Sequence, residues 1–189
     1  MGQAKTLTDA EFKRLLKVVA TERYGQRNRV VLLLGHWAGM RVGEIAALRI
    51  SDVVNNDGSI KESVQLAPDQ TKGNSSRIVH LPKRLQDELG AYIRVGLSSG
   101  NAPLIRSQKS RDGFTANSLC SAVKGWYHLA GIDNGSSHSG RRSFLTKLAV
   151  RGVSARVLQE LAGHRNLATT QRYIDVNDEM KRGAVELAI

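Results

Sequence analysis

The stretch Ala38-Gly39-Met40-Arg41-Val42-Gly43-Glu44 lies at the junction between two predicted helices. The apolar spacing before it predicts a helix that carries Val30, Leu33, Leu34 and Trp37. Gly39 breaks that helix, because glycine readily adopts the left-handed backbone that follows a helix end. Arg41 then opens a short helix that continues through Glu44, Ile45 and Leu48. The junction therefore presents an arginine between two helices.

A capping box precedes this junction near the start of the chain, in Thr8-Asp9-Ala10-Glu11. The Thr8 hydroxyl and the Glu11 carboxylate can satisfy the first free amides of a helix. That helix would carry Phe12, Leu15, Leu16 and Val19 inward.

The pattern changes between about residues 51 and 81. Asn55-Asn56-Asp57-Gly58 and Lys72-Gly73-Asn74-Ser75 predict turns, and residues 60–66 alternate apolar and polar side chains. A second apolar run, residues 78–81, follows the second turn. We expect a small antiparallel sheet of two or three strands here, ended by Pro82.

Helices are predicted for most of the remaining chain. One runs from Lys83 to about Gly96, and another is capped by Thr115 and ended by Gly131. The last two are expected from Ser137 or Ser139 to Gly152, and from a cap at Ser154 to Gly163. The sequence thus predicts a mainly α domain with one small antiparallel β-sheet (α+β).

The charge balance favours a polyanionic partner. The 189 residues include 28 Lys and Arg against 17 Asp and Glu, a formal net charge of +11. A basic excess alone fits either nucleic acid or a merely soluble basic protein. Clustering favours nucleic acid, because eight cations and two acids lie between Arg106 and Arg151.

Cysteine content and hydropathy predict the cytoplasm. The single cysteine, Cys120, excludes an internal disulfide and provides no cluster for zinc. The longest apolar run, residues 30–34, is far too short to cross a bilayer, and the first residues lack a signal peptide's apolar stretch. We therefore expect no membrane partner, and no metal or other cofactor.

Five residues in the order Arg41, His138, Arg141, His164 and Tyr173 form a set with one chemistry. Tyr173 could attack a phosphodiester while Arg41 and Arg141 hold the phosphate oxygens. His138 lies three residues before Arg141 and could accept the phenolic proton, and a ring N–H of His164 could reach a phosphate oxygen. Taken singly, each residue is more ordinarily structural.

The ordered set, with the phrases 38–44 and Leu161-Ala162-Gly163-His164-Arg165-Asn166, resembles the catalytic domain of the tyrosine recombinases, the phage-integrase family. The resemblance covers nearly the whole chain. It implies a 3′-phosphotyrosyl DNA intermediate formed without metal or ATP. It also implies that Lys72, in the predicted turn, protonates the departing 5′ oxygen. The chain differs from the family at Ser139-Gly140, where a leucine more often precedes the arginine.

The resemblance also implies an organisation. Residues 1–189 would form a single catalytic domain without the N-terminal core-binding domain, either as a naturally short member or as a catalytic fragment. The C-terminal residues at near-helical spacing, from Met180 to Ile189, would dock into a neighbouring copy. We expect a homotetramer on DNA, a monomer when free, and a location at the nucleoid or, for a phage protein, in the host cytoplasm.

Two other functions remain open on the sequence. A type IB topoisomerase-like enzyme would use the same residues to relax DNA without joining two sites. A DNA-binding regulator would carry the residues without using them. The target DNA sequence, and the choice among integration, excision, inversion and resolution, cannot be read from basic residues that contact phosphate.

Overall fold

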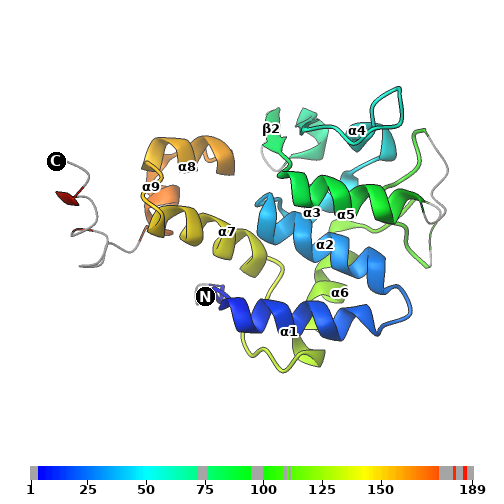
Figure 1. Cartoon of the computed structure of the whole chain (residues 1–189), viewed down its shortest axis with the longest axis horizontal. Helices are drawn as coiled ribbons and strands as arrows, with labels where there is room; N and C mark the ends of the chain where they lie inside the picture. The colour runs from blue at the N-terminus through cyan, green and yellow to red at the C-terminus, as the bar shows by residue number, and fades with distance from the viewer. Residues whose placement is uncertain are drawn as a thin grey trace.

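The computed structural model describes residues 4–71, 76–94, 100–108, 110, 112–174, 181 and 185–186. Its elements in chain order are α1 (Asp9–Ala20), α2 (Gly25–Trp37), α3 (Val42–Ala47), α4 (Ile50–Val53), β1 (Ser63–Leu66), the 3-10 turn η1 (Pro68–Gln70), β2 (Arg77–His80), α5 (Lys83–Arg94), α6 (Ala116–Leu129), α7 (Ser139–Val150), α8 (Ala155–Ala162) and α9 (Leu167–Gln171). The mainly helical fold with one small antiparallel sheet confirms the predicted class (Figure 1).

The described residues form a larger and a smaller lobe. The main hydrophobic core joins α1 to α6 and includes Leu15, Leu33 and Leu89, all fully buried. A second, small core lies between α7 and α8, around Leu145 and Leu158. Figure 1 shows α7 running from the larger lobe to α8 and α9. The N-terminal part of α7 packs on α2, so this seam connects the lobes.

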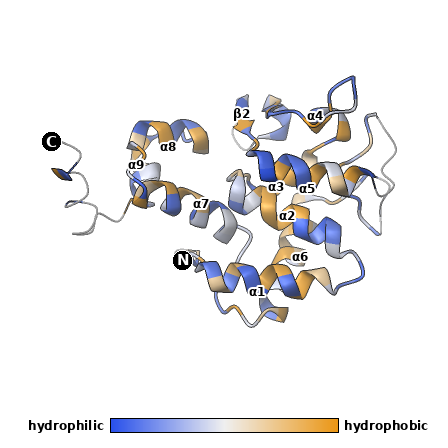
Figure 2. Cartoon of the chain, in the orientation of Figure 1, coloured by the Kyte–Doolittle hydropathy of each residue, from blue (hydrophilic) through white to orange (hydrophobic). Residues whose placement is uncertain are grey.

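Local signals explain most element boundaries. The Thr8–Glu11 capping box starts α1, and the hydroxyls of Thr115 and Ser154 accept amides at the starts of α6 and α8. Gly163 ends α8 with a left-handed backbone, φ 58°. Hydrophobic and hydrophilic residues alternate along α1, α5 and α8, as in amphipathic helices (Figure 2).

The sheet has two strands among the described residues. β1 and β2 pair antiparallel, with Ser63 opposite His80 and Leu66 opposite Arg77. Ile60, expected at the start of a strand, makes only an isolated bridge with Val54. The predicted turn at residues 72–75, and with it Lys72, lies outside the described residues.

Two features were not predicted from the sequence. The short helix α4 begins at Ile50, where the Arg49 amide donates to the Asp52 carboxylate at 2.8 Å. The segment at Leu104, which received no assignment, is buried, and its amide donates to the carbonyl of Leu48 at 2.8 Å. Both features also depend on long-range contacts, since the Ile50 amide donates to the Ala102 carbonyl at 3.0 Å.

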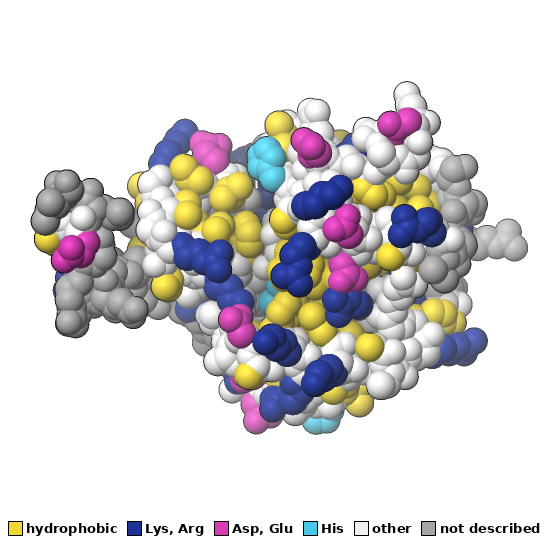
Figure 3. Space-filling model, viewed as in Figure 1, with side chains coloured by type: hydrophobic (Ala, Val, Ile, Leu, Met, Phe, Trp, Pro, Cys, Tyr) yellow, Lys and Arg dark blue, Asp and Glu magenta, His cyan; other side chains and the backbone are white. Residues whose placement is uncertain are grey.

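The face in Figure 3 carries Lys and Arg interspersed with Asp and Glu over the larger lobe, and hydrophobic side chains gather over the smaller lobe. No helix among the described residues is long and apolar enough to cross a membrane. The expected docking helix at the C-terminus falls mostly on residues 175–180, 182–184 and 187–189, outside the described residues.

Candidate active site

Three guanidinium groups meet at the C-terminal end of α8. Arg77 donates to the Leu161 carbonyl at 2.8 Å, and Arg41 donates to the carbonyls of Ala162 and Gly163 at 3.3 and 3.4 Å. Arg141 donates to the same Ala162 carbonyl. The last carbonyls of a helix have no partner within the helix, so they attract cations. The end of α8 therefore gathers arginines from β2, from α7 and from the start of α3.

The buried carboxylate of Glu44 balances part of this charge. Arg77 contacts both of its oxygens, Nε to Oε1 at 3.1 Å and Nη2 to Oε2 at 2.7 Å, and Arg41 Nη1 lies 2.7 Å from Oε1. Burial by itself raises the pKa of Glu44, but the hydrogen bonds and charges of Arg77 and Arg41 outweigh burial and lower it. Glu44 is therefore ionised at neutral pH and orients both guanidiniums.

Arg141 is the buried member of the cluster, with 4% of its surface exposed. Its Nη1 donates to the Gly39 carbonyl at 2.7 Å, in the break between α2 and α3. Burial, with the charges of Arg41 and Arg77, lowers the pKa of Arg141 to about 9. The group still carries its proton at pH 7, so it can hold an anion.

Hydrogen bonds define the tautomer of His164. Its Nε2 lies 3.1 Å from Arg141 Nη2, and its Nδ1 lies 3.0 Å from the hydroxyl of the buried Thr170. A guanidinium can only donate, so Nε2 must carry the lone pair. The proton then sits on Nδ1 and is donated to Thr170. In this state the Nε2 of His164 is an acceptor, and it would need a proton to donate to a phosphate oxygen.

The pH response of His164 follows from this environment. Burial, then the charges of Arg141, Arg41 and Arg77, lowers its pKa from 6.5 to about 4. We expect the imidazole to remain neutral, with Nδ1–H, down to pH 5 in long-range ¹H–¹⁵N NMR spectra. In the unfolded chain His164 gains its second ring proton near pH 6.5, whereas in the folded protein it does so only near pH 4. The contribution of neutral His164 to the free energy of unfolding is therefore full above about pH 6.5 and is lost as the pH falls towards 4.

The same protein unfolded in urea is the control for that titration, and there the His164 midpoint should lie near 6.5. A midpoint near 6.5 in the folded protein as well would contradict the burial of His164 beside the arginine cluster.

Tyr173 lies beside His164, just after α9. The two rings stack with centroids 5.7 Å apart and planes 21° apart, and the guanidinium carbon of Arg142 lies 5.9 Å from the phenol ring. Tyr173 is half-buried and packs against the small core of α7 and α8. The Tyr173 phenol is also close enough to Arg141 to raise its pKa slightly, against the larger lowering by burial. The ring therefore lies next to the arginine cluster and is not separated from it.

The other two predicted site residues lie differently. His138 is the residue before α7, with an exposed side chain, and among the described residues no hydrogen bond or ring contact joins that side chain to the cluster. His138 itself has helical backbone angles, φ −90° and ψ −13°, and the helical face that it is predicted to share with Arg141 stays a prediction. Lys72 belongs to the residues that the structure does not describe, so its place relative to the site stays a prediction.

Arg77 is the residue that the sequence did not point to. Its side chain is 7% exposed and reaches from the first residue of β2 to Glu44 and to α8. A Cβ on Gly163 would lie 2.7 Å from Arg77 Cδ, so Gly163 also makes room for this arginine. The only local signal is a cation directly before the apolar run 78–81, and that pattern more often belongs to a solvated strand end.

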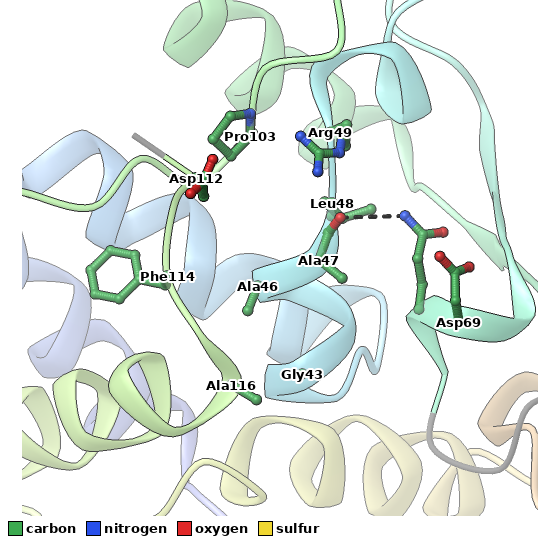
Figure 4. A pocket seen from close by; sticks show the side chains of 11 residues that line it. Gly43, Ala46, Ala47, Leu48, Arg49, Asp69, Pro103, Asp112, Phe114 and Ala116 are labelled. Carbon is green, nitrogen blue, oxygen red and sulfur yellow. Dashed lines mark hydrogen bonds between the residues drawn. The ribbon is translucent and has the colours of Figure 1, made fainter. Parts of the chain in front are cut away.

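A separate pocket of about 320 Å³ lies on α3 beside the cluster. Figure 4 shows it between Phe114 and Asp112 on one side and Asp69 on the other, with the Gln70 amide donating to the Ala47 carbonyl at 3.3 Å. Its lining in the described part of the chain includes none of the predicted site residues. No group of three or more His, Cys, Asp or Glu side chains suited to a metal ion occurs within the described ranges.

Comparison with known proteins supports one family. The sequence matches the phage integrase family over residues 5–180. It is 36% identical over 185 residues to the tyrosine recombinase XerA of Thermococcus kodakarensis, an alignment that covers 97% of this chain and 62% of that protein. The chain thus spans about three fifths of the length of the curated relatives it matches.

Solved structures support the fold. A XerA recombinase superposes with a TM-score of 0.77 at 26% identity, covering 100% of this chain and 66% of that one. The catalytic domain of bacteriophage HP1 integrase superposes with a TM-score of 0.69 at 19% identity, covering 97% of this chain and 95% of that one. The second likeness is one of fold alone, and it spans nearly all of a chain described as a catalytic domain.

Proposed function

The chain belongs to the phage integrase family, and on that premise we propose that it is a site-specific recombinase that cuts and rejoins double-stranded DNA. Residues 1–189 would act as the breaking and rejoining domain. The names of the relatives, tyrosine recombinases, support the reaction class. The basic composition, a formal net charge of +11, supports DNA as the partner.

One observation carries the proposal: three guanidiniums converge beside His164 and Tyr173 around a single carboxylate. Arg41, Arg77 and Arg141 against Glu44 leave a net charge of +2 in a partly buried site. Burial first, and then the charges of Arg41 and Arg77, lower the pKa of Arg141, so the three cations repel one another in this site. A phosphodiester anion would relieve that repulsion, and the developing charge of an attacked phosphorus would relieve it further.

The proposed step balances as a transesterification. The phenol oxygen of Tyr173 forms a bond to phosphorus, the bond from phosphorus to the 5′ oxygen breaks, and the 3′ phosphate remains on the tyrosine. We propose that His138 accepts the phenolic proton and that Lys72 supplies a proton to the 5′ oxygen. Arg41 and Arg141 would hold the phosphate oxygens. His164 would donate to one of them only after the bound anion raises its pKa enough for Nε2 to take a proton.

The enzyme is proposed to need neither ATP nor metal. The phosphotyrosine keeps the energy of the broken ester, so a 5′ hydroxyl of a second strand can reverse the step and exchange strands. Strand exchange requires several active sites on two duplexes, and a homotetramer formed through the C-terminal residues would provide them. We propose that the protein is a monomer when it is not bound to DNA. Its location would be the nucleoid or, for a phage protein, the host cytoplasm.

A trapping experiment tests the function. The protein is incubated with fragmented DNA from the source cell, denatured rapidly, and isolated with any DNA covalently attached. We expect adducts through a 3′ phosphate on Tyr173, enriched in one short sequence, identified by mass spectrometry of the peptide and by sequencing.

The other outcomes separate the alternatives. Adducts spread over unrelated sequences, with relaxation of supercoiled plasmid, would indicate a topoisomerase-like enzyme. Binding of one DNA sequence without any adduct, with supercoiled and linear DNA and over a range of salt, would indicate a regulator and overturn the proposal.

A further inference from the structure

Where α2 packs against α7, two aromatic side chains each pack directly against the backbone of a glycine. A Cβ on Gly140 would lie 2.8 Å from Nδ1 and 3.0 Å from Cε1 of His36, so the imidazole occupies the space of a side chain there. In the opposite direction, a Cβ on Gly39 would lie 2.5 Å from Cδ1 of Phe144. A ring from α2 therefore packs on a glycine of α7, a ring from α7 packs on the glycine just after α2, and neither glycine leaves room for a methyl group.

This contact between α2 and α7 lies next to Arg41 and Arg141, the two arginines proposed to hold the phosphate. Arg141 follows Gly140 directly, and Arg41 comes two residues after Gly39. The Gly39 carbonyl accepts from Arg141 Nη1 at 2.7 Å. A change in the spacing of α2 and α7 would therefore move Arg141 relative to Arg41, Ala162 and His164.

The imidazole of His36 is held rigidly in its place. Its Nδ1 donates to the Leu32 carbonyl at 2.9 Å, and Phe12 of α1 stacks on it with centroids 4.1 Å apart. Burial lowers its pKa to about 4, so the ring is neutral. Its Nε2 is the one buried side-chain nitrogen or oxygen that has no hydrogen-bond partner among the described residues. Since an unmade hydrogen bond is unfavourable, the ring's shape rather than its polarity accounts for its place.

We propose that His36 is a positioning residue: seated against Gly140, it sets the distance between α2 and α7 and thereby the place of the Arg141 guanidinium. It acts through Gly140 and need not touch DNA. The effect on cleavage rests on the proposed function, whereas the effect on Arg141 itself does not.

The test compares two single variants, Gly140→Ala and His36→Ala, with the double variant that combines them. In Gly140→Ala the added methyl meets His36, so we expect the single-turnover cleavage rate at saturating DNA to fall roughly ten- to hundredfold. His36→Ala leaves α7 without its spacer and should also be slow. In the double variant the imidazole is gone, and the remaining contact, 3.1 Å to the Gly35 carbonyl carbon, needs only a small shift. We therefore expect its rate to exceed that of either single variant.

Two other glycines, one in α2 and one in α6, provide matched controls. A Cβ on Gly35, in the same seam, would meet its nearest neighbour at an ordinary 3.9 Å, and a Cβ on Gly125 of α6 would meet nothing within 4 Å. Gly35→Ala and Gly125→Ala should therefore cleave DNA at the rate of the unchanged protein.

A second measurement needs no DNA and no activity. Displacement of Arg141 in Gly140→Ala should raise the pKa of His164 from about 4 in the direction of 6.5, and the double variant should bring this pKa back down. Both titrations are measured by ¹⁵N NMR. If the unchanged protein cleaves no DNA, the proposed function fails while this titration still tests the seam.

A pKa of His164 that is the same in folded Gly140→Ala as in the unchanged protein would overturn the inference. So would a double variant that is no faster than the faster of the two single variants. If Gly140→Ala does not fold, His36→Ala alone is compared with the double variant, which must be the more active of the two.

Discussion

Replacement of Tyr173 by phenylalanine is expected to abolish the covalent DNA adduct. The variant lacks only the phenol oxygen that would attack phosphorus, and loss of a nucleophile commonly lowers turnover by roughly 10⁶-fold. Its ring should still stack on His164, where the centroids lie 5.7 Å apart, and still pack on the small core. DNA affinity should therefore change little, measured by fluorescence anisotropy at fixed salt.

The matched control for this variant is Tyr24→Phe. Tyr24 lies before α2, where its ring faces the guanidinium of Arg27 at 4.5 Å, far along the chain from the cluster. That variant should form adducts at the rate of the unchanged protein. Persistence of the adduct in Tyr173→Phe would assign the nucleophile to another residue and would remove the proposed role of Tyr173.

Replacement of Glu44 by glutamine is expected to give the largest loss of stability. The Glu44 side chain is 1% exposed and the Arg77 side chain 7%, so both charges are held away from water. Glutamine keeps the shape but leaves Arg77 and Arg41 without a buried anion. Breaking a buried pair in this way costs about 3 to 5 kcal/mol, a large part of a typical total of about 5 to 15 kcal/mol. Denaturant unfolding followed by circular dichroism measures the loss.

The surface pair of Arg29 with Glu88 is the control for this change. Arg29 Nε lies 2.8 Å from Glu88 Oε2 in a similar two-point contact, but the side chains are 32% and 27% exposed. Glu88→Gln should therefore lose less than about 1 kcal/mol. Equal losses from Glu44→Gln and Glu88→Gln would mean that burial of the Glu44 site contributes nothing.

The pH dependence of the Glu44 effect has a definite sign. The folded protein lowers the pKa of Glu44 below its ordinary 4.5, so the contribution to stability is full above about pH 4.5 and is lost as the pH falls further. The difference in unfolding free energy between the unchanged protein and Glu44→Gln should be largest near neutral pH and should shrink in acid.

Much of the fold could be predicted because its signals are local. The Thr8 cap, the Ser154 cap and the left-handed Gly163 each depend on residues within one helical turn. The sheet was also predicted, but its number of strands was left at two or three, since pairing depends on which segments meet in space. The helix α4 was missed for the same reason, because its first residue packs against a segment about fifty positions later, where the Ile50 amide donates to the Ala102 carbonyl at 3.0 Å.

The candidate site was predicted in part. The structure brings together Arg41, Arg141, His164 and Tyr173, as the ordered motifs suggested. His138 comes directly before α7 and its side chain is exposed, so its part in the reaction stays a prediction. A three-residue spacing places two side chains on neighbouring parts of a helical face, but it does not say how exposed either side chain is.

The sequence by itself determined most of the longer helices, their caps and the order of the reacting groups, because these follow from short-range periodicity and from side-chain chemistry. Only the tertiary structure revealed that Arg77 shares Glu44 with Arg41, across 33 positions, and that the ring of His36 fills the space at Gly140. Such contacts join residues far apart in the chain. They form only when packing of the helices removes both groups from water, and no pattern along the sequence records that distance.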